Sequence, residues 1–436
     1  MPLWLLKADI ISGPLPWIVW AVSAVLVATL VIRRPRRRWV VRAGVGVLAG
    51  GVLGVVAILV LVANGTVAHP GRTLFLWAGG GLAALGLAIA TLWDSPGWRK
   101  GIAIAALPCV LLAATLGINA RFGIDRTVGD FLGVSTLQKA DGLKGPAPLA
   151  TAGQKPLYET WKPPADMPAV GKVSALTDDA AIPSTGGFKP RDASIYLPPA
   201  ALVDDPPPLP LVVHMMGQPG DPNPQFIQGA MDKLAAENNG LAPIVIVADQ
   251  LGDVNQNPAC MDSAAYGGVA TYFNVDIPAY AAAKLRIIPD HRYWTISGYS
   301  NGGACAFAWG AEHPDIWGNL VSISGEEFQG SEEQDAILNT VFNGDQAAYD
   351  AAKPASIAAA NRGKYAGHPA IFTAGELDPA YVAAAKSSAM TAQDAGFDTS
   401  LFVIPGADHV VTALEGGLPT AYRTLFPHLG LAPPAR

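Results

Sequence analysis

The sequence predicts a transmembrane region of four helices, followed by an α/β domain in which helices cover both faces of a mostly parallel sheet. Long runs without charged residues predict the first part. Short apolar runs that alternate with alanine-rich segments predict the second. The 436 residues exceed one ordinary domain. We expect a membrane domain at 1–120, a juxtamembrane segment and linker at 121–189, and the α/β domain at 190–436.

Charge-free runs of 19, 21, 21 and 17 residues occupy the membrane region, at 14–32, 43–63, 73–93 and 102–118. A helix needs about 20 apolar residues to cross the hydrocarbon core of a bilayer, and about 17 is the lower limit. The alternative for the first run is a cleaved signal peptide, but its arginines follow the apolar core instead of preceding it. Gly46, Gly50 and Gly54 recur at a spacing that suits close packing between helices.

Positive charge is concentrated in two of the connecting loops. The loop "RRPRRRWVVR" carries six arginines and "DSPGWRKG" carries Arg99 and Lys100, whereas the loop between the second and third runs has only Arg72. The positive-inside rule places both basic loops in the cytoplasm, so the α/β domain faces the extracytoplasmic side of a multi-pass membrane protein. Residues 1–120 have a net charge of +8 and the remainder −14. The acidic remainder argues against nucleic acid as a partner, because phosphate contacts need Lys and Arg.

The segment after the membrane region becomes regular only near residue 190. Residues 138–190 are rich in Pro, Gly, Ala and Lys and are expected to form linker and early loops. Strand-like runs then alternate with helical segments, and the runs are "ASIYLP", "LPLVVHMM", "APIVIVAD", "YWTISG", "LVSISG", "AIFTAG" and "SLFVIPG". A sheet of this kind places its active site at the carboxyl ends of its strands.

The strongest motif is the G-x-S-x-G sequence formed by Gly298, Ser300 and Gly302. A strand-like run precedes it and a small-residue helix follows, which is the context of a nucleophile in a strained strand-to-helix turn. The glycines avoid clashes where strand and helix approach. The alternative is that Ser300 is only a polar residue in a tight turn.

A nucleophilic serine needs a base, and in the chain order serine, acid, histidine the base must follow residue 300. Of His313, His368, His409 and His428, only His409 lies in the loop after the last strand-like run. His313 is expected to cap or pack against the nucleophile helix. His368 lies at the wrong end of its strand, and His428 lies in the final segment.

The acid is expected just beyond the preceding strand, in "AIFTAGELDPAY". Asp378 is favoured over Glu376, because a few residues of turn bring its carboxylate towards His409, which it would orient and stabilise. Asp408 is interpreted as ordinary loop charge. For the oxyanion hole, the sequence predicts the backbone N–H groups of Asn301 and Gln218.

These segments resemble the esterase branch of the α/β hydrolases that includes esterase D (S-formylglutathione hydrolase) and the corynebacterial and mycobacterial mycolyltransferases. The similarity rests on "PLPLVVHMMGQPGDP", "YWTISGYSNGGACAFAWGAEHPDIW", "FTAGELD" and "FVIPGADH", and covers about residues 190–430. The resemblance implies an α/β hydrolase fold with a triad of Ser300, Asp378 and His409.

Together with the four membrane runs, the chain looks most like multi-pass membrane esterases of actinobacteria. Some of these act on envelope lipids, including removal of amino acids from aminoacylated phosphatidylglycerol. Two positions depart from the family pattern. Met216-Gly217 stands where His-Gly is frequent, and Asn301 stands where Met or Gln is frequent. Backbone amides serve the oxyanion hole, so these departures bear on the substrate and not on the hole.

The chain has three cysteines, and Cys109 lies within the fourth membrane run. Cys260 and Cys305 lie in the domain expected outside the cell, where disulfides persist, and we expect them to be bonded. The alternative is a pair of buried free thiols. No metal-site constellation is apparent and no cofactor is expected.

Three functions are consistent with these features. The leading one is a membrane-anchored serine esterase that cuts lipid or cell-envelope esters outside the cell, with the bilayer as its partner. The second is an acyltransferase that moves an acyl group from Ser300 to a sugar or glycerol hydroxyl. The third is a non-catalytic membrane sensor with a hydrolase-like domain, which the complete serine, acid and histidine set argues against.

Overall fold

The computed structural model describes the chain except for residues 35, 64–70, 94, 124, 147–154, 255 and 435–436. The chain forms two compact units, an N-terminal unit, Met1–Thr136, and a C-terminal unit, Leu137–Arg436. The division between the two units falls inside 121–189, the segment expected to be juxtamembrane segment and linker. Residues 121–136 belong to the N-terminal unit, where Asp9 and Thr127 form a β-bridge.

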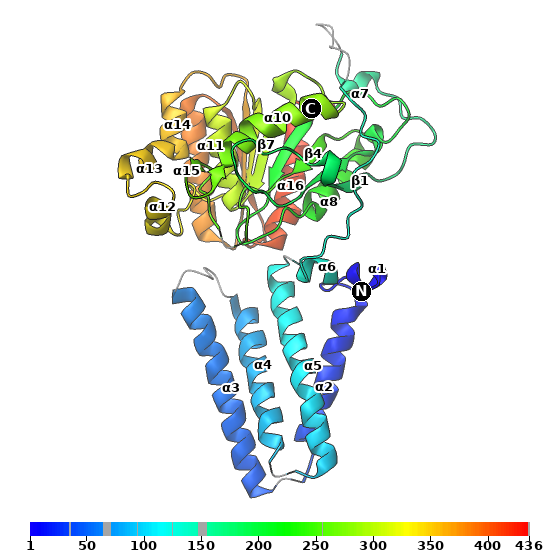
Figure 1. The fold of residues 1–436 in the computed structure, drawn as a ribbon, viewed down its shortest axis with the longest axis vertical. Helices are drawn as coiled ribbons and strands as arrows, with labels where there is room; N and C mark the ends of the chain where they lie inside the picture. Colours follow the sequence, from blue (N-terminus) through cyan, green and yellow to red (C-terminus); the bar gives the residue numbers. More distant parts are fainter. Residues whose placement is uncertain are drawn as a thin grey trace. The chain divides into compact units, whose positions relative to one another are not determined.

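The N-terminal unit contains four long helices and two short ones (Figure 1). They are α1 (Leu3–Leu6), α2 (Pro14–Val31), α3 (Arg37–Ala63), α4 (Gly71–Thr91), α5 (Gly97–Phe122) and α6 (Val128–Phe131). Among the described residues, α2, α3, α4 and α5 are the helices long and apolar enough to cross a membrane. The four predicted runs fall within them, apart from the end residues Ile32, Leu92 and Trp93. α5 ends at Gly123, whose φ of 65° terminates the helix in the left-handed conformation that glycine adopts freely.

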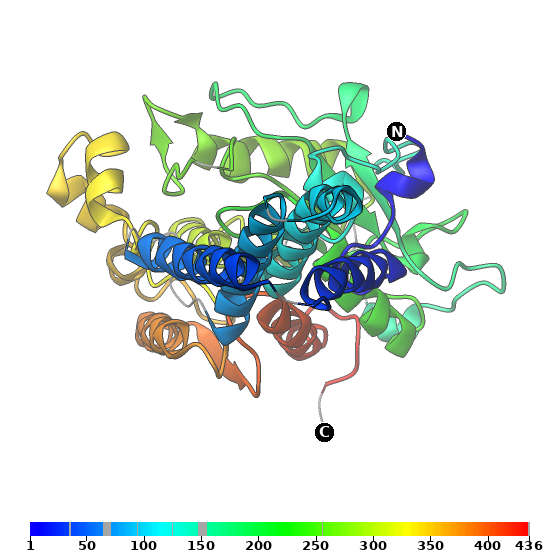
Figure 2. The same ribbon diagram turned by 90° about the horizontal axis from the view of Figure 1, so that it is seen from below.

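The long helices neighbour one another in the order α3, α4, α5, α2, as Figure 2 shows from one end. The glycines for which close helix packing was predicted, Gly46, Gly50 and Gly54, lie where α3 contacts α4. A Cβ on Gly46 would overlap the carbonyl of Gly86, and a Cβ on Gly50 would overlap that of Leu82. The two backbones can approach this closely only because glycine has no side chain.

The C-terminal unit is built on an eight-stranded sheet with the order β1-β2-β4-β3-β7-β8-β9-β10. Its strands are β1 (Lys172–Leu176), β2 (Ala193–Leu197), β3 (Leu211–Met215), β4 (Ile244–Val247), β7 (Trp294–Tyr299), β8 (Asn319–Ile323), β9 (Pro369–Gly375) and β10 (Asp398–Ile404). β2 is antiparallel to both neighbours, whereas the six strands that follow it in this order are parallel to one another, namely β4, β3, β7, β8, β9 and β10. β5 (Asp262–Ser263) and β6 (Gly267–Gly268) form a separate hairpin. The predicted mostly parallel sheet is confirmed.

β1 corrects the prediction that residues 138–190 are linker and loops. It pairs with β2, and the segment before it also joins the sheet, since Ala140 N–H donates to Ala175 O and Ala175 N–H donates to Gln138 O. β1 has five residues and a partly exposed burial pattern, so its sequence carries little periodicity. It becomes a strand because partners are available at the edge of the sheet.

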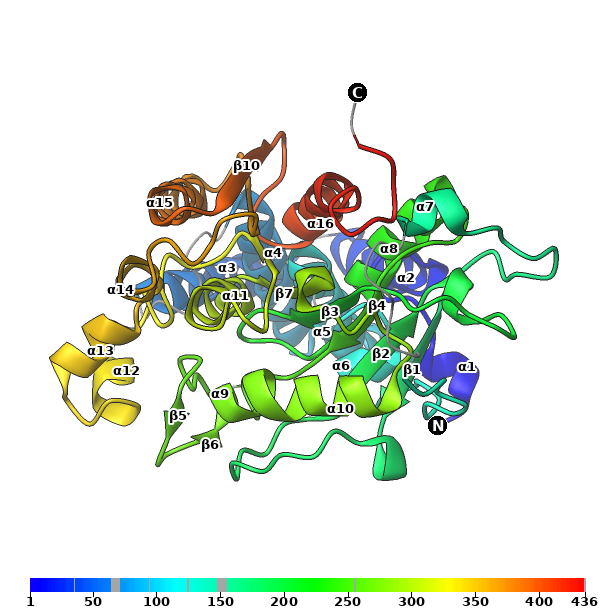
Figure 3. The ribbon, with the colours of Figure 1, turned by 90° about the horizontal axis from the view of Figure 1, so that it is seen from above.

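Helices cover both faces of the sheet, as the sequence predicts. α8 and α16 pack against each other on one face, while α10 and α11 lie on the other (Figure 3). The helices are α7 (Leu157–Thr160), α8 (Gln225–Glu237), α9 (Val269–Thr271), α10 (Ile277–Lys284), α11 (Asn301–Glu312), α12 (Gln334–Thr340), α13 (Gln346–Ala352), α14 (Pro354–Ala360), α15 (Pro379–Ala395) and α16 (Val411–Leu425). β3, β4, β7 and β8 are buried along their whole length, which explains why they read as continuous apolar runs.

Candidate active site

Ser300 lies between the end of β7 and the first residue of α11. Its φ of 53° and ψ of −119° are a conformation that residues with a side chain rarely adopt. The turn is held because Ser300 N–H donates to Ile323 O of β8, at 3.0 Å. Such a strained turn presents the serine hydroxyl at the carboxyl end of the sheet.

The two motif glycines make this turn possible. A Cβ on Gly298 would overlap the Gly302 carbonyl, and a Cβ on Gly302 would lie 2.6 Å from both the Met215 Cβ and the Met216 carbonyl oxygen. Strand and helix therefore approach through bare backbone, as the sequence predicts.

The structure brings His409 to Ser300. Its Nε2 lies 3.1 Å from the Ser300 Oγ, which is hydrogen-bond distance. His409 lies in the loop between β10 and α16, and its backbone carbonyl accepts a 2.7 Å hydrogen bond from the Tyr299 hydroxyl. A residue beside the nucleophile thus anchors the loop that carries the candidate base.

Asp378 completes the constellation. Its Oδ2 lies 3.3 Å from the His409 Nδ1, and the carboxylate is almost fully buried at the N-terminus of α15. The separation is that of an ion pair and exceeds the 2.7–2.9 Å usual for charge-assisted hydrogen bonds. Catalytic contacts are often long before substrate binds and tighten afterwards.

The other acids considered from the sequence have different partners. Glu376 Oε2 accepts a hydrogen bond from Gly406 N–H at 2.9 Å, so it braces the loop after β10. Asp408 accepts from Val410 N–H and from the Thr412 hydroxyl at the start of α16. Asp378 is therefore the carboxylate at the candidate base.

Two tyrosines flank the His409 ring. The Tyr381 ring centroid lies 3.8 Å from that of His409, and the Tyr299 centroid lies 5.4 Å away. The Tyr381 hydroxyl donates to Glu332 Oε1 at 2.7 Å and is also within hydrogen-bonding contact of the Ser300 side chain. Burial raises the pKa of Tyr381, and the charges of Glu326 and Glu332 raise it further, so the phenol keeps its proton.

Glu326 adds a second carboxyl beside the nucleophile. Its N–H lies 3.3 Å from the Ser300 carbonyl oxygen, and its Oε2 accepts from Gly330 N–H and Ser331 N–H. Burial, reinforced by the charge of Glu332, raises its pKa to about 7. The sequence did not indicate Glu326, Glu332 or Tyr381 as site residues, because they belong to no motif. Only the position of Tyr381, one turn after Asp378, could have indicated its place.

The predicted oxyanion residues lie on either side of the nucleophile. A Cβ on Gly217 would be 3.1 Å from the Ser300 Cβ, so the loop that carries the next amide, that of Gln218, passes directly beside the serine. Asn301 is the first residue of α11, and its side chain is 1 % exposed. The roles of the two backbone amides in an oxyanion hole stay predictions.

Cys260 and Cys305 form a disulfide between the segment that follows β4 and helix α11. Polar contacts also join the segment after β4 to α11. The Asn301 Nδ2 donates to Asn257 Oδ1 at 3.3 Å, and the Asn257 Nδ2 donates to Glu333 Oε1 at 2.8 Å. The disulfide thus attaches the segment that follows β4 to α11, the helix that begins directly after Ser300.

The remaining histidines lie outside the triad. His214 is fully buried with its Nδ1 3.0 Å from the Ser297 Oγ, and burial lowers its pKa to about 3. The N–H of His313 closes the last turn of α11. Burial lowers the pKa of His368, which lies just before β9, and of His428, which follows α16.

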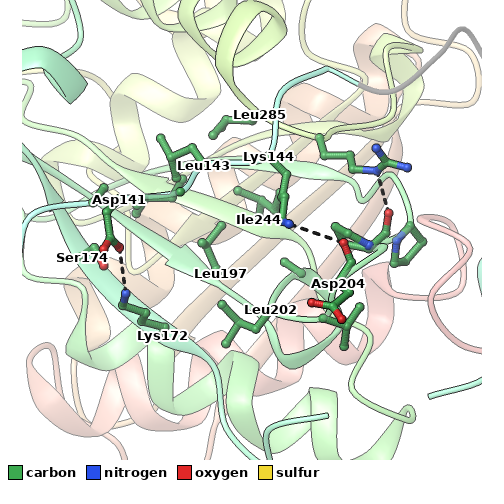
Figure 4. Close-up of a pocket in the computed structure, with 18 residues that line it drawn as sticks. Asp141, Leu143, Lys144, Lys172, Ser174, Leu197, Leu202, Asp204, Ile244 and Leu285 are labelled. Atoms are coloured by element: carbon green, nitrogen blue, oxygen red, sulfur yellow. Dashed lines mark hydrogen bonds and ion pairs between the residues drawn. The ribbon is translucent and has the colours of Figure 1, made fainter. Parts of the chain in front are cut away.

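A separate cavity of about 170 Å³ lies at the other end of the sheet (Figure 4). It is lined by Ile244 at the amino end of β4, Lys172 of β1 and Leu285 before β7. The candidate triad lies at the carboxyl ends of the strands, so this cavity is not part of the candidate site. Within the described ranges, no group of three or more His, Cys, Asp or Glu side chains is placed to hold a metal ion.

Fold and geometry define the class of the C-terminal unit, which has the α/β hydrolase fold. Residues 192–404 match the family Esterase PHB depolymerase, so the C-terminal unit contains a domain similar to that esterase family. The chain belongs to the same family as an uncharacterized protein of Corynebacterium glutamicum. The two are 32% identical over 324 residues, which cover 71% of this chain and 72% of the relative.

Solved structures show more distant similarity. A ferulic acid esterase has a TM-score of 0.49 and 16% identity, and the match covers 60% of this chain and 98% of that protein. An S-formylglutathione hydrolase from Agrobacterium tumefaciens has a TM-score of 0.46 and 16% identity, with 61% of this chain and 98% of that protein covered.

Proposed function

We propose that this protein is a membrane-anchored serine esterase that hydrolyses carboxylic esters of envelope lipids outside the cell. The observation that carries the proposal is the 3.1 Å contact between the Ser300 Oγ and the His409 Nε2, backed by the buried Asp378 carboxylate. A serine hydroxyl becomes an effective nucleophile when a positioned base takes its proton.

The reaction would proceed through an acyl-enzyme. The Ser300 Oγ attacks the ester carbonyl carbon while the His409 Nε2 takes the hydroxyl proton, and the amides of Gln218 and Asn301 stabilise the oxyanion. The ester C–O bond then breaks, and His409 returns the proton to the leaving alcohol. Water attacks the acyl-serine by the same route, which releases the carboxylic acid and restores Ser300.

Location supports a lipid substrate. The four long apolar helices would confine the enzyme to a membrane. The basic loops at 33–42 and 95–100 favour a cytoplasmic position for those ends. Helices α2 and α5 then lead to the opposite side, where the C-terminal unit would meet esters of the outer leaflet and envelope.

The acidic groups beside Ser300 support an aminoacyl ester as substrate. Glu326 and Glu332 lie close enough to raise the pKa of Tyr381, and the Tyr381 hydroxyl bonds Glu332 while contacting Ser300. An ammonium group on the acyl part would be attracted by the Glu332 carboxylate, and by Glu326 once the pH exceeds its pKa of about 7. An ester whose acyl part carries a negative charge in place of the ammonium group would be repelled by the same carboxylates. Removal of an amino acid from an aminoacyl phospholipid meets this requirement.

The first test is labelling of the detergent-solubilised chain with a fluorophosphonate probe, which reacts with activated serines. Wild-type protein should be labelled, Ser300→Ala and His409→Ala should not, and the exposed Ser356→Ala should be labelled like the wild type. No labelling of a folded wild-type protein would contradict the triad.

The second test compares alanyl-phosphatidylglycerol with its N-acetylalanyl counterpart, which lacks the positive charge. Wild-type protein should prefer the charged ester. Glu332→Gln should reduce that preference roughly twofold to fivefold, since Glu332 is exposed and its attraction is screened by solvent. An unchanged preference would exclude Glu332 from recognition of the substrate.

Glycerol and sugar acceptors are then added to the same assay. Acyl transfer to their hydroxyl groups would appear as a new ester, and that product would favour the acyltransferase function.

A further inference from the structure

The loop 216–221 carries one of the two amides of the proposed oxyanion hole, that of Gln218. The other amide, that of Asn301, belongs to a different loop, since it opens α11 after β7. An oxyanion hole works only if both donors are fixed before charge develops on the substrate. Some contact must therefore set the two loops relative to each other.

Gln250 makes that contact. It lies just beyond the carboxyl end of β4, which neighbours β3 in the sheet (Figure 3). Its side chain is 3 % exposed, and its Nε2 donates to the Met216 carbonyl at 2.7 Å and to the Asn301 Oδ1 at 3.1 Å. One carboxamide nitrogen thus holds the start of the first loop and the residue that supplies the second amide.

The residue before Gln250 secures the other end of the same loop. Asp249 is 1 % exposed and accepts from the Arg191 Nε at 3.1 Å and the Arg191 NH2 at 2.7 Å. The Arg191 NH1 donates to Asp221 Oδ1 at 2.7 Å. The loop 216–221 is therefore attached at both ends to consecutive residues that follow β4.

We propose that Gln250 is a positioning residue of the oxyanion hole, which aligns the Gln218 and Asn301 amides by bonding Met216 and Asn301 together. Arg191 and Asp249 assist by holding the end of the loop at Asp221. Gln250 touches the two loops and not the reacting atoms, so it acts through the amides. The inference rests on the proposed function of Ser300.

Loss of the Gln250 contact should slow the chemical step more than it weakens substrate binding. Complete removal of one oxyanion donor costs about 100-fold to 1000-fold in kcat. A loop that still visits the correct position loses less, and we expect a fall of roughly 10-fold to 100-fold in kcat. KM for a soluble p-nitrophenyl ester should stay within about twofold, because the ground state makes no strong use of the hole.

The test uses the full-length protein in detergent with two variants. Gln250→Glu keeps the shape of the side chain but puts a carboxylate oxygen against the Met216 carbonyl and the Asn301 Oδ1. Gln250→Met removes both hydrogen bonds without adding charge, and so provides a second variant if the first does not fold. The matched control is Gln393→Glu, the same change at an exposed position of α15.

The decisive readout is inhibition by a trifluoromethyl ketone, which places an oxyanion in the hole. Its inhibition constant should rise in parallel with the fall in kcat, while the melting temperature of the folded variant stays near that of the control. Unchanged kcat in folded variants, or reduced kcat with undiminished inhibitor affinity, would overturn the inference. Failure of the proposed function looks different, since wild-type protein would then neither hydrolyse the ester nor react with the fluorophosphonate.

Discussion

Replacing Glu326 with glutamine should make the stability of the C-terminal unit less dependent on pH. Burial and the charge of Glu332 raise the pKa of Glu326 from 4.5 to about 7. The folded protein therefore holds this proton more tightly than the unfolded chain does. The contribution of the protonated carboxyl is fully present below pH 4.5, is lost as the pH rises towards 7, and stays lost at higher pH.

The magnitude follows from the shift, because each pKa unit corresponds to about 1.36 kcal/mol. A shift from 4.5 to about 7 gives a loss on the order of 3 kcal/mol in the free energy of unfolding across that interval. Glutamine does not titrate, so Glu326→Gln should avoid this loss. Its stability relative to the wild type should increase from pH 4.5 to 7 and then become constant.

The assay is thermal unfolding of the detergent-solubilised protein at a series of pH values from 4.5 to 8. The difference in melting temperature between Glu326→Gln and wild type should widen by several degrees over this range. The control is Glu415→Gln, the same change at an exposed residue of α16. A difference between Glu326→Gln and wild type that does not change with pH would show that Glu326 titrates near its ordinary value, and the reasoning from burial would fail.

Two further predictions concern the nucleophile turn and the disulfide. Gly302→Ala should abolish fluorophosphonate labelling and lower the melting temperature, because its Cβ would lie 2.6 Å from the Met215 Cβ and the Met216 carbonyl. Gly229→Ala on α8 has open space for its Cβ and should stabilise the helix by about 0.5–1 kcal/mol, and equal effects of the two changes would contradict the close approach. Cys260→Ser with Cys305→Ser should cost about 4 kcal/mol in the chain-entropy estimate and lower the melting temperature, whereas Cys109→Ser should leave it near the wild-type value. A melting temperature unaffected by loss of Cys260 and Cys305 would show that the bond contributes nothing to the fold.

Much of the candidate site could be predicted because it lies at strand ends in a known chain order. Ser300, Asp378 and His409 each follow a buried apolar run, and parallel strands bring their carboxyl ends to one edge. The choice of Asp378 over Glu376 depended on the length of the turn alone. The structure supplies a physical reason, since Glu376 is engaged by Gly406 N–H.

The sequence could not predict the structure or role of residues whose contacts are all with segments distant in the chain. β1 was interpreted as linker, because five partly exposed residues have no pattern until β2 pairs with them. Tyr381, Glu326 and Gln250 belong to no motif. Each gains a role only when β4, β8 and α15 bring their ends together around Ser300.

The sequence by itself determined the four long apolar helices and the glycine-bounded nucleophile turn. Both depend on local properties, namely hydrophobic length and the absence of side chains at Gly298 and Gly302. Tertiary structure decided which charged groups surround the candidate site and which side chain joins Met216 to Asn301. A buried carboxyl such as Glu326 acquires its proton affinity, and Gln250 its two partners, only from groups that folding places within a few ångströms.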